Sequence, residues 1–201
     1  MGIIQTALKK FTDKAQHVLL FGAREAGTPA NARIDDVTEC IMIVDHSHHE
    51  VHDGDGYRYT DPVTLASGAS QDYLLTVANT TKWPHFTFSA DGTAITTVEV
   101  FSATDRTGTT LQSIFNANEN STNTAGLTIH KGATGGTTDG VSIFRYSSGT
   151  ATGSAKMESA ALYSSERILK QNTKYIIRIT SGTNGNLCNL RAEWYEHTSR
   201  N

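Results

Sequence analysis

Apolar and polar residues alternate along most of the chain after residue 40, and this period of two predicts β-strands with one buried face. The predicted strands are Tyr57–Thr60, Tyr73–Val77, Phe86–Ala90, Ile95–Phe101, Leu127–Ile129, Val141–Phe144, Tyr175–Ile179 and Leu187–Tyr195. Cys40–Val44 is apolar throughout, which predicts a further strand buried on both faces. Asp91 and Gly92 are typical turn residues and predict a hairpin between the strands on either side of them. About eight strands without an interior helix predict an all-β fold, a jelly-roll-like β-sandwich.

The first 40 residues follow a different pattern. Ile4, Leu8 and Phe11 recur at four- and three-residue spacing, which predicts an amphipathic helix over residues 3–16. Such a short terminal helix is marginal alone, so we expect its apolar side to bind its own domain or a partner. These three residues are therefore interface candidates. We divide the chain into an N-terminal helix and extended arm (1–40), in which residues 17–22 are compatible with a short strand, and a β-sandwich domain (41–201).

Composition supports the strand prediction and narrows the classes of partner. Thr, Ser, Gly and Asn are abundant, as in strands joined by polar loops, here residues 116–124, 131–140 and 147–154. Lys and Arg number 17 against 20 Asp and Glu, and no basic stripe occurs, so we expect no nucleic-acid partner. No apolar stretch approaches the roughly 20 residues that span a bilayer, and no signal-peptide pattern begins the chain. We therefore expect no membrane partner and synthesis in a cytoplasm.

Two cysteines and two tryptophans lie in or next to apolar, strand-like segments, and we expect them to have structural rather than chemical roles. Cys40 and Cys188 both lie in strand-like segments, and we favour buried, reduced thiols over a disulfide. A domain of this size buries enough core to be stable without a covalent link. Trp83 and Trp194 lie at or within predicted strands, which favours core anchors over sugar-binding platforms.

The histidine-rich run from His46 to His52 is the segment that most invites a chemical interpretation. In a strand, His46, His48 and His52 share one face, and three imidazoles there could hold zinc or iron. The cupin metal motif also begins with a His-x-His pair, but it continues with a Glu where this chain has His52 or Asp53, and no second histidine motif follows. We therefore expect no metal, and instead a subunit contact made by His48, His49 and His52 that loosens in mild acid.

Other catalytic signatures are missing from the sequence. No Gly-x-Ser-x-Gly elbow occurs, and the glycine-rich residues 132–136 lack the Lys and Ser/Thr of a phosphate-binding loop. Asp53 and Asp55 resemble the start of a calcium loop, but Thr64 stands where a closing Glu is needed. Glu193 and Glu196 fall on opposite faces of a strand, which argues against a paired-carboxylate site. We expect no catalytic residue, no cofactor and no enzymatic activity.

Four short motifs occur in an order that resembles the head decoration (cement) proteins of tailed bacteriophages. They are His48–Gly54, Asn79–Phe88, Leu169–Tyr175 and Ala192–His197, and residues 17–22 resemble the entry segment of such virion proteins. The resemblance covers most of residues 17–197. It implies a β-sandwich that forms a homotrimer, binds the major capsid protein on the outside of the capsid, and has no active site.

Two other functions remain open at the level of sequence. The first is the receptor- or glycan-binding head of a phage tail fibre, which would use the polar loops at 116–124, 131–140 and 147–154. The second is a cupin-like metalloenzyme built around the His46–His52 run. Co-sedimentation with capsids would favour a decoration protein, a signal on a glycan array would favour a tail-fibre head, and a bound metal in elemental analysis would favour a metalloenzyme.

Overall fold

A computed structural model describes residues 21–23, 29–31, 46–149 and 165–198. The chain divides into two compact units, residues 1–45 and residues 46–201, here called the N-terminal unit and the sandwich unit. In the N-terminal unit, β1 (Phe21–Ala23) pairs antiparallel with β2 (Pro29–Asn31). The helix predicted over residues 3–16, with Ile4, Leu8 and Phe11, lies outside the described residues, as does the strand predicted at residues 40–44.

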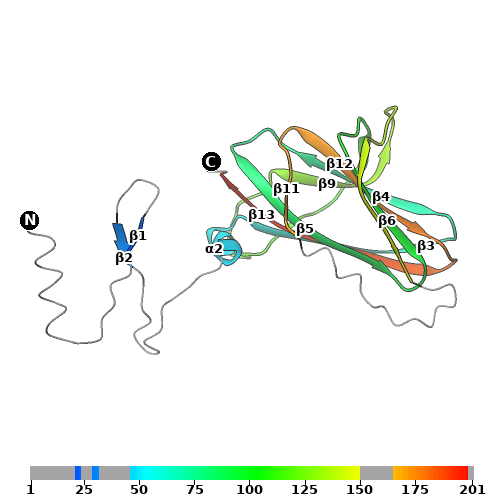
Figure 1. The fold of residues 1–201 in the computed structure, drawn as a ribbon, viewed down its shortest axis with the longest axis horizontal. Coiled ribbons are helices and arrows are strands. Elements are labelled where there is room, and N and C mark those ends of the chain that lie inside the picture. Colours follow the sequence, from blue (N-terminus) through cyan, green and yellow to red (C-terminus); the bar gives the residue numbers. More distant parts are fainter. Residues whose placement is uncertain (1–20, 24–28, 32–45, 150–164, 199–201) are drawn as a thin grey trace, which may run out of the picture. The chain divides into compact units, whose positions relative to one another are not determined.

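The sandwich unit consists of one short helix and two antiparallel sheets that face each other (Figure 1). The helix is α2 (His46–Asp53). The β13 sheet has the order β11-β5-β13-β3-β8, with β3 (Gly56–Leu65), β5 (Lys82–Gly92), β8 (Phe115–Asn116), β11 (Arg167–Ile168) and β13 (Asn186–Thr198). The β12 sheet has the order β10-β6-β12-β4-β9-β7, with β4 (Ser70–Val77), β6 (Thr96–Ser102), β7 (Thr107–Leu111), β9 (Leu127–Thr134), β10 (Val141–Ser148) and β12 (Thr173–Ser181).

The strand order is that of a jelly roll with one insertion. Eight strands taken in chain order, β3, β4, β5, β6, β10, β11, β12 and β13, form one sheet in the order first-eighth-third-sixth. The other sheet has the order second-seventh-fourth-fifth, so the pair follows the double Greek-key path of a jelly roll. Strands β7, β8 and β9 are inserted between β6 and β10 and extend both sheets on the side away from β10 and β11. The predicted jelly-roll-like sandwich is confirmed.

The alternating residues form the core between the sheets, as predicted. The core cluster includes Tyr73, Leu75 and Val77 from β4, Tyr175, Ile177 and Ile179 from β12, Phe86, Phe88 and Ala90 from β5, and Cys188, Leu190, Ala192 and Trp194 from β13. Trp194 is 4% exposed and confirms the predicted anchor, whereas Trp83 is only partly buried. Burial raises the pKa of the Cys188 thiol, and Cys188 is a free, buried cysteine as predicted. Cys40 lies outside the described residues.

The predicted hairpin at Asp91 and Gly92 is wrong, because β5 and β6 belong to opposite sheets. The buried side chain of Asn186 holds the connecting corner. Its Oδ1 accepts a hydrogen bond from the Ala94 N–H at 2.9 Å, and its Nδ2 donates to the Thr96 hydroxyl at 2.9 Å and to a neighbouring carbonyl. These bonds come from a residue about 90 positions away, so no local turn signal could reveal them.

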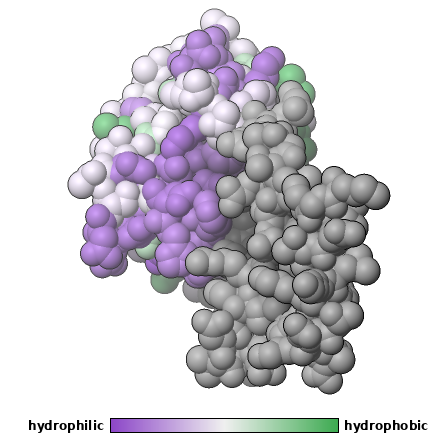
Figure 2. All heavy atoms as spheres, turned by 90° about the vertical axis from the view of Figure 1, so that its left-hand side faces the viewer, coloured by the Kyte–Doolittle hydropathy of each residue, from purple (hydrophilic) through white to green (hydrophobic). Residues whose placement is uncertain are grey.

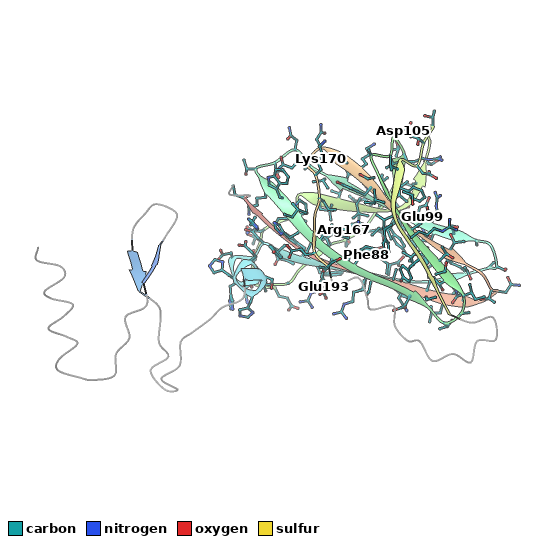
Figure 3. All side chains as sticks on the ribbon, viewed as in Figure 1. Phe88, Glu99, Asp105, Arg167, Lys170 and Glu193 are labelled. Atoms are coloured by element: carbon teal, nitrogen blue, oxygen red, sulfur yellow. The ribbon has the colours of Figure 1, made fainter. Side chains whose placement is uncertain are left out.

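The centre of the outer face of the β12 sheet is covered. Leu74 and Ile176 point away from the core, since they alternate with core residues, yet they are 1% and 0% exposed. Two segments of the chain, residues 103–106 and 135–140, are tied to this face and to each other. Figure 3 shows Asp105 beyond this sheet, Glu193 beyond the other, and Phe88 between the two layers.

A network of ion pairs holds these two segments on the outer face of the β12 sheet. The Arg178 guanidinium binds Asp72 through two nitrogens at 2.7 and 2.8 Å and reaches Asp139 through the third at 2.8 Å. Arg106 binds the other oxygen of Asp139 at 2.8 Å, and the Arg178 side chain also lies over the Phe101 ring. The hydrogen bond from Arg178 outweighs burial and lowers the pKa of Asp139. The network therefore links the inserted segments to the central strand of the sheet.

Candidate interaction site

The residues from His46 to His52 form a helix, so the prediction that they form a strand is wrong. Glu50 is buried and Val51 is half-buried, and both lie on the side of α2 toward the sheet. The helix ends at Asp53, and the following Gly54 has a φ of +80° and donates its N–H to the Val51 carbonyl at 3.1 Å. A glycine with positive φ directly after the last turn is the common C-terminal helix signal. That signal was present in the sequence and would have favoured a helix.

The helix rearranges the predicted histidine grouping. His48 and His52 are one turn apart, and their Nε2 atoms lie 2.9 Å from each other on the exposed side. His49 pairs with Asp53, with Nδ1 and Oδ2 3.3 Å apart. A helix does not place His46 on the strand face predicted for the three histidines, and its side chain is not described. Within the described ranges, no group of three or more His, Cys, Asp or Glu side chains is arranged to hold a metal ion.

The four short motifs singled out in the sequence meet at the α2 end of the sandwich unit. Lys82 Nζ lies 2.6 Å from the Asp55 carboxylate, which joins the second motif to the turn after the first. The Glu196 N–H donates to the Asp55 carbonyl at 2.9 Å, which joins the fourth motif to the same turn. Gln171 Nε2 donates to the Lys82 carbonyl at 2.9 Å, and the Leu169 N–H donates to the Pro84 carbonyl at 2.9 Å. The Asp55 N–H in turn donates to the Glu50 carbonyl of the first motif at 2.9 Å. We call the four motifs together with Asp55, that is residues 48–55, 79–88, 169–175 and 192–197, the motif cluster.

Two interaction centres hold the motif cluster together. The first is His85, whose Nδ1 lies 2.6 Å from Glu166 Oε1, while the Tyr195 hydroxyl donates to the other Glu166 oxygen at 2.9 Å. The His85 ring also stacks on the rings of Tyr195 and His197, at centroid distances of 4.7 and 4.3 Å. Burial alone would raise the pKa of Glu166, but the hydrogen bonds from His85 and Tyr195 outweigh it and lower this pKa.

The second centre is the Glu196 carboxylate, which is 4% exposed. It accepts hydrogen bonds from the N–H groups of Gly126 and Leu127 at 2.9 and 3.0 Å and from the Trp194 indole at 3.1 Å. Because Leu127 starts a strand of the β12 sheet, this carboxylate joins the two sheets. Glu193 is exposed on the opposite face of β13, so the predicted separation of the two carboxylates is confirmed.

Two shallow grooves lie on the outer face of the β13 sheet, the first next to α2 and the second farther along the strands. The first has a volume of about 470 Å³ and is lined by α2, β3, β5 and β13, with Arg58, Thr87, Glu193 and Tyr195 among its residues. The second has a volume of about 350 Å³ and includes Thr60, Ser89, Asp91, Asn189 and Arg191. The end of the sandwich unit that carries α2, which faces the viewer in Figure 2, is mainly hydrophilic over its described surface.

Comparison of this chain with family models, with curated proteins and with solved structures finds no match. Among the described residues, no helix combines the length and the apolar character needed to cross a bilayer. The fold alone therefore defines the class, a jelly-roll β-sandwich, while residues 1–45 form a separate compact unit.

Proposed function

We propose that this chain is a structural virion protein, a capsid decoration or cement protein that binds the major capsid protein on the outside of a tailed-phage head. The single observation that carries the proposal is the motif cluster. Four motifs spread over about 150 residues resemble the decoration proteins in sequence order, and they join in one place on the folded chain. A jelly roll is also a common architecture for capsid proteins.

The proposed mechanism is stabilisation by selective binding. A protein that binds the assembled shell but not free subunits shifts the assembly equilibrium toward the shell. A homotrimer that contacts several capsid subunits raises the effective concentration for its second and third contacts. Each contact can then be weak while the trimer stays bound for a long time. No catalytic residue and no cofactor has a part in this function.

The proposed contact residues lie in two separate parts of the chain, the exposed side of α2 and the N-terminal segment. His48, His49 and His52 are exposed on α2, which starts directly after residue 45, where the N-terminal unit ends in sequence. Ile4, Leu8 and Phe11 supply the apolar part of the contact in this proposal. The alternative of a cupin-like metalloenzyme gains no support from the described residues, because the His46–His52 run, which it needs as a strand, is a helix.

The test uses heads assembled from the major capsid protein of the phage that encodes this chain. We expect the wild-type chain to elute as a trimer in light scattering and to co-sediment with these heads. A variant with His48→Ser, His49→Ser and His52→Ser should bind less tightly, while Arg145→Ala on β10 serves as a matched surface control. A monomeric wild-type chain that does not co-sediment would refute the proposal, and equal binding by the triple variant would remove α2 from the contact.

A further inference from the structure

We propose that the outer face of the β13 sheet is a carbohydrate-binding surface, a function separate from binding to the shell. The strand register places outward-facing residues in four cross-strand rows. From the α2 end, the rows are Gly56–Tyr195–His85, Arg58–Glu193–Thr87, Thr60–Arg191–Ser89 and Pro62–Asn189–Asp91. The two grooves described above cover the first and last pairs of rows, so they follow one another along β13.

The length of this face suits a chain-like ligand. Tyr195 and Asn189 stand at its two ends on β13, six residues apart in an extended strand. At a rise of about 3.4 Å per residue, the rows extend over roughly 20 Å. α2 closes the first groove on one side through Ser47 and His48. The surface is therefore an open channel that can hold several sugar residues in line, rather than a pocket for one compact molecule.

The chemistry of the rows fits hydroxyl groups. Arg58 and Arg191 offer several donors, and Glu193 and Asp91 offer acceptors, beside hydroxyl side chains of Thr and Ser in the same rows. Two pairs of these groups bind each other. Arg191 binds Glu193 at 2.8 Å, and Asn189 Nδ2 donates to Asp91 at 3.1 Å. Neighbouring donors and acceptors can bind adjacent hydroxyl groups of a sugar ring.

Other ligand classes fit this face less well. A nucleic acid requires a basic surface, whereas here the carboxylates of Glu193, Glu166 and Asp91 accompany the two arginines. A protein interface needs apolar or aromatic side chains that become fully buried at its centre, and the two central rows hold only charged and hydroxyl side chains. A neutral, polyhydroxylated chain requires neither a basic surface nor an apolar centre. Jelly rolls also form lectin domains, so the fold is compatible with this role.

The test is affinity electrophoresis of the full-length chain through gels that contain one of four soluble neutral polysaccharides, namely dextran, mannan, a galactan and a β-1,3-glucan. We expect at least one of them to retard the wild-type chain. Glu193→Ala and Arg58→Ala should each weaken that binding about tenfold, the size expected for one lost hydrogen bond to a charged group. Glu99→Ala, a carboxylate substitution on the β12 sheet, is the matched control and should keep the wild-type retardation.

Two outcomes would overturn the proposal. One is a wild-type chain that migrates equally in all four gels and in a gel without polysaccharide. The other is retardation that survives both Glu193→Ala and Arg58→Ala, because binding would then lie elsewhere. Both variants change exposed or groove-lining residues away from the core, and their far-UV circular dichroism should match the wild type. The co-sedimentation of the Arg58→Ala variant with phage heads should also be unchanged, because Arg58 lies outside the motif cluster and outside the proposed contact residues, and this separates the test from that of the proposed function.

Discussion

The outer faces of the two sheets differ in what covers them. On the β12 sheet, residues 103–106 and 135–140 lie over the strands, and Leu74 and Ile176 are buried beneath the inserted part of the chain. On the β13 sheet, the corresponding rows hold polar side chains along shallow grooves. The centre of the β12 sheet is thus buried on both sides, whereas the β13 sheet is buried on one side. The difference indicates that the insertion between β6 and β10 serves stability, while the β13 face is available to a ligand.

The ion pairs on the outer faces of the two sheets also differ in how far they are exposed to water. Arg178 binds two carboxylates on the covered face, and its side chain is 25% exposed. On the open face, Arg191 binds Glu193 and no other carboxylate among the described residues, and its side chain is 66% exposed. Pairs in contact with water contribute little net stability, because water and salt screen them. A pair held in place by several hydrogen bonds contributes more.

The largest expected effect comes from a matched pair of leucines. Leu74→Ala removes an outward-facing but buried side chain from β4, and we expect it to lower the free energy of unfolding by about 2–5 kcal/mol. Leu187→Ala changes an outward-facing side chain of β13 that is 42% exposed, and it should cost less than about 1 kcal/mol. Urea unfolding followed by tryptophan fluorescence measures both. Equal costs would show that the β12 face is not covered in solution.

The next largest effect compares two arginines. Arg178→Ala removes three charged hydrogen bonds and leaves Asp72 and Asp139 without this partner, so we expect a loss of about 1–3 kcal/mol. Arg191→Ala should change the free energy of unfolding by no more than about 0.5 kcal/mol. Denaturant midpoints at low and high salt measure both effects. If high salt destabilises the wild type until Arg178→Ala no longer differs from it, the Arg178 network is exposed to water instead.

The smallest expected effect is a dependence on acid. Backbone N–H groups of Thr138 and Thr137 bind the Asp105 carboxylate and lower its pKa from 3.8 to about 2. Because the folded-state pKa is the lower one, the contribution of Asp105 is complete above pH 3.8 and disappears as the pH falls through 2. Asp105→Asn should therefore lose stability at neutral pH and show a weaker decline over this acid range than the wild type. Denaturant midpoints at several acid pH values measure it, with Glu193→Gln on the open face as the control.

The sequence predicted much of the sandwich because alternation is a local signal. Tyr73, Leu75 and Val77 were assigned to one buried face, and the structure confirms it. Adjacent apolar residues in Tyr73-Leu74-Leu75 and Tyr175-Ile176-Ile177 also carried a signal of burial on both faces that the alternating interpretation missed. The candidate site was predicted less well. His48, His49 and His52 are exposed as interface candidates require, but on a helix, and the His85–Glu166–Tyr195 contacts were not foreseen.

The sequence by itself determined which residues of the main strands face the core between the sheets, because a period of two depends only on neighbouring residues. Only the tertiary structure decided which strands pair, that Asn186 turns the chain from one sheet to the other, and that Glu196 joins β13 to the start of β9. These decisions depend on hydrogen bonds between residues about 70 to 90 positions apart, and no local pattern encodes such partners. The same is true of the two outer faces, since coverage depends on where an insertion packs.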